Sequence, residues 1–99
     1  MDKSALKDSA IRTIELEHEA VENLITRIND EFISACEIIL QCKGRVIVMG
    51  IGKSGHIANK IAATLASTGT PAQFVHAAEA SHGDIGMVTD RDVVIAISN

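Results

Sequence analysis

The chain has no tryptophan and no tyrosine, and its two phenylalanines are only 2% of its 99 residues. Aromatic side chains are the surfaces on which single-stranded bases stack. The formal net charge of -4 also gives the protein no overall attraction for nucleic acid or for an anionic membrane. We therefore expect neither as a partner, and any positively charged site must be local.

Long apolar segments are absent as well. The N-terminal sequence MDKSALKDSA lacks the apolar core of a secretory signal, and no run approaches the roughly 18 residues of a membrane span. Only two cysteines are present, Cys36 and Cys42, and their spacing matches neither a zinc ribbon nor a C-x-x-C redox motif. We expect both thiols to be reduced and the protein to be cytoplasmic.

Residues 1–44 are expected to be helical. From Ile11 to Ile28 the apolar residues recur every three or four positions, with His18 in the one missing step, which predicts one amphipathic helix. Such a stripe needs a partner, so we expect it to pack on the domain and on a second subunit, giving a homo-oligomer. Asn29 then provides a cap for a second helix, over about Asp30–Gln41.

Residues 45–99 have the pattern of a parallel α/β fold. In chain order we predict a strand at Val46–Met49, a helix at about Ser54–Thr68, a strand at Gln73–His76, a loop or short helix at 77–90 and a strand at Asp92–Ile97. This order predicts a three-layer α/β/α sandwich with right-handed crossovers and a sheet of about three strands, which with residues 1–44 forms part of a single domain. Because so small a sheet leaves an edge and a face uncovered, we expect the natural protein to continue beyond Asn99.

The strongest local signal is the sequence RVIVMGIGKSG, from Arg45 to Gly55, in which a strand runs into a glycine loop with a lysine and a serine. Glycines let the backbone approach a ligand closely, and the free N–H groups at the start of a helix favour an anion. Ligands of parallel sheets bind at the carboxyl ends of the strands. The glycine loop, His76 and Ser98 all fall at that edge, which predicts an anion site there.

The loop sequence GIGKSG matches G-x-G-x-x-G, but two kinds of nucleotide site fit it poorly. A dinucleotide site requires an acid at the end of the second strand, and here that strand ends in Phe74-Val75-His76. A nucleotide P-loop would require glycine where Ile47 stands. A phosphomonoester bound by Lys53 and Ser54 fits better. A plain tight turn with a solvent-facing lysine is the structural alternative.

A second polar cluster is the sequence HAAEASHGD, from His76 to Asp84. Its H-x-x-E-x-x-H spacing places Glu79 three residues from both His76 and His82. These groups could bind substrate or move protons. A metal on His76 and His82 is the less favoured interpretation, because the spacing is not the H-E-x-x-H of zinc enzymes. The third interpretation is that these polar residues only cap the loop or face solvent.

Three blocks of the sequence together resemble the sugar isomerase (SIS) domain, and within it the D-arabinose 5-phosphate isomerases of 3-deoxy-D-manno-octulosonate synthesis. The blocks are GIGKSGH from Gly50, AATLASTGTP from Ala62 and FVHAAEASHGDIGM from Phe74. The resemblance covers nearly the whole chain. It departs from the family at Ala77, where relatives commonly have proline, and the chain ends before the family's second phosphate loop and its later glutamates and histidine.

The resemblance implies reversible conversion of D-arabinose 5-phosphate to D-ribulose 5-phosphate through an enediol, in lipopolysaccharide synthesis and without a redox cofactor. It also implies that this chain is the N-terminal portion of an isomerase and is inactive alone. The alternative is a non-catalytic SIS module that binds a phosphosugar as a regulatory signal.

Specific residues acquire roles from the same resemblance. Ser54 and the neighbouring loop amides would bind the phosphate, Lys53 would bind substrate or stabilise developing negative charge, and His82 would act in ring opening or proton relay. Together with the residues indicated by position and spacing, the expected substrate-binding residues are Gly52, Lys53, Ser54, Gly55, His76, Glu79 and Ser98. Lys53 and His82 are the expected catalytic residues.

Overall fold

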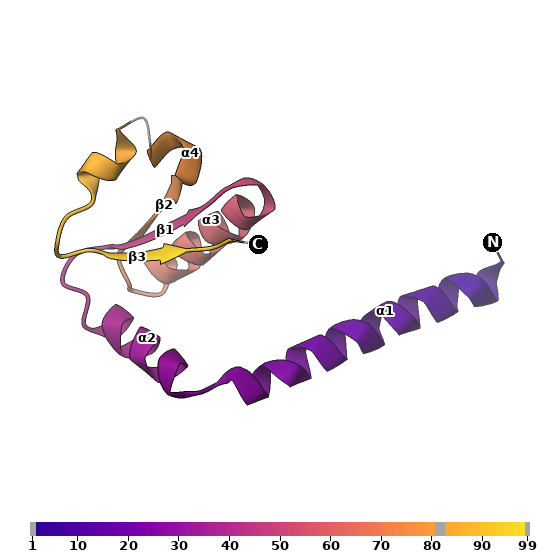
Figure 1. Cartoon of the computed structure of the whole chain (residues 1–99). Helices are drawn as coiled ribbons and strands as arrows, with labels where there is room; N and C mark the ends of the chain where they lie inside the picture. Colours follow the sequence, from indigo (N-terminus) through magenta and orange to yellow (C-terminus); the bar gives the residue numbers. More distant parts are fainter. Residues whose placement is uncertain (1, 81–82, 99) are drawn as a thin grey trace. The chain divides into compact units, whose positions relative to one another are not determined.

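The computed structural model in Figure 1 describes residues 2–80 and 83–98. Contacts divide the chain into two compact units, Met1–Cys36 and Glu37–Asn99. Among the described residues, no helix is both long enough and apolar enough to cross a membrane.

The N-terminal unit contains the long helix α1 (Lys3–Asn23) and then a turn of 3-10 helix, η1 (Leu24–Arg27). The predicted long helix is therefore confirmed, but it was wrong in continuing to Ile28. It begins before the stripe because Asp2 caps it, its carboxylate accepting a hydrogen bond of 2.7 Å from the Ala5 amide. It ends earlier because the chain tightens into η1 and Ile28 is extended.

The apolar stripe of this unit is exposed. Its side chains range from 53% exposed at Ile11 to 71% at Ile25, and His18, which lies in the stripe, is 3.6 Å from Glu22. None of the described residues of α1 is buried. Oligomerisation through this stripe stays a prediction.

The second helix, α2 (Asp30–Leu40), agrees with its predicted position. The side-chain oxygen of Asn29 accepts a hydrogen bond of 3.1 Å from the Phe32 amide, and Asp30 and Glu31 lie in the first turn. The helix therefore starts with the cap and the acids that the sequence indicates.

The parallel α/β prediction is confirmed. β1 (Val46–Gly50), β2 (Ala72–His76) and β3 (Val93–Ala96) form a parallel sheet in the order β2-β1-β3 (Figure 1). Helix α3 (Gly52–Ser67) connects β1 to β2, and α4 (Ala77–Ala80) with a 3-10 turn, η2 (Asp84–Met87), lies between β2 and β3.

The two faces of the sheet have separate cores, which makes the fold three-layered. On one face Val46 and Val48 pack with Ala58 and Ala62 of α3. On the other face Ile47 and Val75 pack with Ala80 of α4, and the partly buried Val88 packs against them. Val46, Ile47 and Val48 are all 0% exposed, which explains why β1 is an unbroken apolar run.

Asp92 ties together the amino ends of the strands. One oxygen of its carboxylate accepts a hydrogen bond of 2.7 Å from the Arg45 amide, and the other oxygen accepts one of 2.8 Å from the Thr89 amide. The hydrogen bond from Arg45, followed by that from Thr89, holds the pKa of Asp92 below its ordinary value of 3.8. The ionised form of this carboxylate therefore stabilises the fold.

Replacing Asp92 by asparagine is expected to destabilise the protein at pH 7, because one amide oxygen cannot accept from both backbone donors. A lowered folded-state pKa means that the stabilisation is fully present above the unfolded-state pKa, about 4, and is lost as pH falls through the folded-state pKa. The difference in urea midpoint between Asp92→Asn and the parent should thus shrink below about pH 4. Asp90→Asn, nearby and exposed, is the control. A difference that is the same at pH 7 and pH 3 would contradict the assignment.

Candidate functional site

The predicted anion site lies where β1 ends and α3 begins. α3 starts at Gly52, not at the predicted Ser54, and Ile51 precedes it in extended conformation without a side-chain hydrogen bond to the helix. The earlier start requires a positive φ at Gly52, +60°, which glycine adopts without the steric cost of a Cβ. Since the first N–H groups of a helix have no partner within it, this turn is open to an anion.

Two further glycines bring the strand and the helix into close contact. A Cβ on Gly50 would lie 2.7 Å from the Ser54 carbonyl oxygen, and one on Gly55 would lie 3.0 Å from the Gly50 carbonyl oxygen. Both glycines are buried. The absence of side chains at these two positions therefore fixes where α3 starts, and with it where Ser54 lies.

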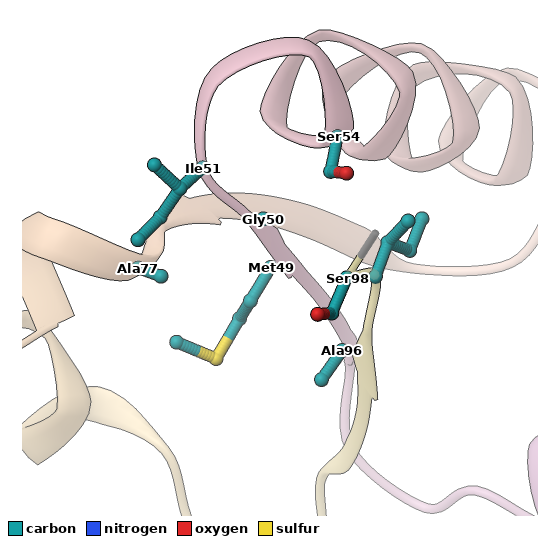
Figure 2. Close-up of a pocket in the computed structure, with 8 residues that line it drawn as sticks. Met49, Gly50, Ile51, Ser54, Ala77, Ala96 and Ser98 are labelled. Carbon is teal, nitrogen blue, oxygen red and sulfur yellow. The ribbon is translucent and has the colours of Figure 1, made fainter.

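A cleft of about 340 Å³ opens at the carboxyl ends of β1 and β3. Figure 2 shows its lining, in which the polar side chains are Ser54 from α3 and Ser98 from the residues after β3. A neighbouring hollow of about 510 Å³ also contains Ser54 and Ser98 and adds Lys53. The structure thus brings together three of the predicted residues, two hydroxyls and an ammonium, which suit the oxygens of a phosphate or sugar.

His76 lies in a different hollow, of about 250 Å³, together with Gly52, Gly55, His56 and Asn59. Its Nδ1 accepts a hydrogen bond of 3.2 Å from the Ala78 amide, and its ring meets Phe74 edge-on with centroids 6.3 Å apart. Because Nδ1 accepts, the neutral ring carries its proton on Nε2. His76 in this orientation offers a hydrogen-bond donor rather than the lone pair that a metal would need.

Glu79, the other predicted residue that the structure describes, is separate from these hollows. It is exposed on α4. His82, the second expected catalytic residue, lies outside the described residues. Among the described residues, no group of three or more His, Cys, Asp or Glu side chains is arranged to hold a metal ion.

Sequence reasoning missed the apolar part of the cleft. Apolar side chains from three strand ends form it: Met49, Ile51, Ala77, Ala96 and Ile97. All of them lie at or just after the carboxyl end of a strand, so their positions relative to the predicted strands could have identified them. They give the cleft a surface that can exclude water from a bound ligand.

The fold is a parallel α/β domain, and its candidate anion site lies at the carboxyl edge of the sheet. Residues 39–99 match the SIS domain. The chain belongs to the SIS domain family, as the sequence blocks indicated.

Curated relatives are similar to most of this chain. Arabinose 5-phosphate isomerase KdsD of Pseudomonas aeruginosa is 66% identical over 91 residues, which are 92% of this chain and 28% of that protein. Arabinose 5-phosphate isomerase GutQ of Escherichia coli is 57% identical over 94 residues, which are 95% of this chain and 29% of that protein. The chain therefore spans somewhat more than a quarter of the length of these relatives.

Solved structures share the fold over the whole chain. An Escherichia coli protein in complex with A5P has a TM-score of 0.93 at 47% identity and covers 100% of this chain, which covers 53% of it. A putative sugar-phosphate isomerase from Listeria monocytogenes has a TM-score of 0.85 at 31% identity, with coverages of 100% and 52%. Both agree with the α/β/α class.

Proposed function

We propose that this chain forms part of an aldose-ketose isomerase that interconverts D-arabinose 5-phosphate and D-ribulose 5-phosphate through an enediol. One observation carries the proposal: Lys53, Ser54 and Ser98 meet at the uncapped start of α3. The similarity to KdsD and GutQ, and to a structure in complex with A5P, supports a pentose 5-phosphate as the substrate.

In this proposal the phosphate binds at the first turn of α3. The N–H groups of that turn and the hydroxyls of Ser54 and Ser98 donate to its oxygens. The sugar then extends along the apolar wall of the cleft, which keeps water away from the reacting carbons.

The chemical step moves a proton between C1 and C2 of the open-chain sugar. Negative charge develops on the sugar oxygens as the enediolate forms, and the Lys53 ammonium stabilises it there. In this proposal His82 relays protons, while His76 and Glu79 line neither of the two hollows that contain Ser54 and Ser98, so no contact with the bound sugar is assigned to them. The aldose and the ketose are isomers, so the reaction needs no external oxidant or reductant and no redox cofactor.

The proposal is tested with a chimaera, because the chain spans only 28% of the Pseudomonas aeruginosa enzyme. This segment replaces the matching segment of that isomerase, and turnover of D-arabinose 5-phosphate is measured. We expect activity of the same order as the parent enzyme, and negligible activity from the 99-residue chain alone. A chimaera that binds the sugar phosphate without turning it over would favour the regulatory SIS module instead. Failure to bind would contradict both.

We further propose that the exposed stripe of the N-terminal unit pairs with a second copy of the chain, since side chains such as Ile14, 69% exposed, are costly to leave in water. Ile14→Lys together with Val21→Lys is expected to lower the sedimenting mass. Glu19→Lys, on the other side of the helix, should leave it unchanged. An unaltered mass in the double variant would refute the pairing.

We place the protein in the cytoplasm. Cys36 and Cys42 are free thiols, which suits a reducing compartment, and the proposed substrate is a phosphorylated sugar. Recovery of the native protein in a periplasmic fraction would contradict this location.

A further inference from the structure

The side chain of Arg45 links the sheet to the connection between β2 and β3. Its guanidinium donates one hydrogen bond to the side-chain oxygen of Gln73 on β2 and another, of 3.3 Å, to the carbonyl of Met87 at the end of η2. The Gln73 amide also lies 3.9 Å from the Met87 sulfur. One partly buried side chain therefore fastens η2 to the sheet.

The chemistry of this contact is specific to arginine. Its two acceptors belong to different segments, and a guanidinium presents separate N–H groups in a fixed plane that can reach both at once. A lysine ammonium on a flexible stem would not hold the same two acceptors with fixed geometry. Neither acceptor is charged, so the contact is an anchor and not an ion pair.

The connection that Arg45 anchors also forms part of the cleft. Ala77, its first residue, lines the cleft opposite β3 residues, and Ala80, only 7% exposed, packs on Ile47 and Val75. Farther along, the partly buried Val88 packs against the same core. The connection is therefore held at its start by apolar packing and at its end by Arg45.

We infer that Arg45 is a positioning residue for the proposed isomerase. By fastening η2 to the sheet, it helps to fix the connection after β2, whose first residue, Ala77, lines the cleft. Arg45 precedes β1 and the cleft lies at Gly50, so strand geometry separates them by roughly 16 Å at about 3.3 Å per residue. Arg45 thus acts through the connection and does not touch the substrate.

The anchor is tested first in the 99-residue chain, where it does not depend on the proposed function. Hydrogen exchange is measured at the amides of Gly86 and Val88, which are hydrogen-bonded within η2. In Arg45→Met their exchange is expected to rise roughly two- to tenfold, as loss of a hydrogen bond predicts. Arg91→Met removes the same charge from an exposed arginine and should leave it unchanged. Equal exchange in the two variants would overturn the anchor.

The effect on turnover rests on the proposed function and is measured in the chimaera. Arg45→Met should lower kcat with little change in KM, and Arg45→Lys should recover only part of the loss. If Arg45→Met does not fold, Arg45→Lys still tests the positioning role. A wild-type kcat in Arg45→Lys, together with faster hydrogen exchange at η2, would overturn that role. An inactive parent chimaera would instead contradict the proposed function, while the exchange result on the anchor would stand.

Discussion

Replacing Lys53 by methionine is expected to lower isomerase turnover by roughly 10²- to 10³-fold, the usual cost of removing one group that stabilises transition-state charge. Lys53 lies in the first turn of α3 and lines a hollow with Ser54 and Ser98. A fixed cation beside the sugar gains most when the enediolate forms, so the loss should be in kcat. Methionine keeps an unbranched apolar stem and removes only the charge.

The matched control is Lys60→Met, on the same helix. Lys60 is exposed and lines a shallow hollow with His56, Asn59 and Ala63, apart from both serines. Its replacement should leave kcat and KM unchanged. A raised KM with unchanged kcat in Lys53→Met would assign Lys53 to ground-state binding alone. If kcat and KM of Lys53→Met both equal those of the parent, Lys53 is not part of the site.

The parallel sheet could be predicted because burial leaves a strong trace in the sequence. β1 is covered on both faces, by α3 and by the connection after β2, so every side chain from Val46 to Val48 must be apolar. Helix starts leave a weaker trace. Asp2 was a recognisable cap for α1, but the apolar stripe becomes regular only at Ile11. The start of α3 was hard to predict because a glycine can adopt a positive φ, as Gly52 does, without being required to.

The candidate site could be predicted in part, for a topological reason. Residues that follow parallel strands must meet at one edge, which places Ser54 near Ser98 whatever the details of the loops. The sequence did not indicate that His76 lies in a separate hollow with Gly55. That position depends on the register that pairs Gly50 with His76, and a shift of one residue would move the imidazole to the other face.

The Arg45 anchor lies beyond prediction from local sequence. Its acceptors are 28 and 42 residues away in the chain, and both depend on how the connection after β2 folds back. A motif search finds groups whose spacing is fixed by one helix or one turn. Hydrogen bonds between distant segments carry no such spacing.

Gly50→Ala is expected to reduce the free energy of unfolding by about 1–3 kcal/mol, the typical cost of overpacking a filled site. The new Cβ would lie 2.7 Å from the Ser54 carbonyl oxygen and 2.9 Å from the Gly55 nitrogen. Both are backbone atoms, so no side chain can rotate away. β1 is held between β2 and β3, so relief must come from displacing the first turn of α3. We therefore expect weaker phosphate binding together with the lower stability.

Gly86→Ala is the matched control for that experiment, since a Cβ on Gly86 would meet no atom within 4 Å and its φ is not positive. Its melting temperature should stay near that of the parent, whereas Gly50→Ala should melt lower by roughly 4–8 °C for each kcal/mol lost. Gly52→Ala separates the two causes, because its Cβ also meets open space but its φ is +60°. It should lose stability through backbone strain of roughly 1–2 kcal/mol while α3 keeps its place. If Gly50→Ala melts no lower than Gly86→Ala, close contact between the strand end and the helix start is not what positions Ser54.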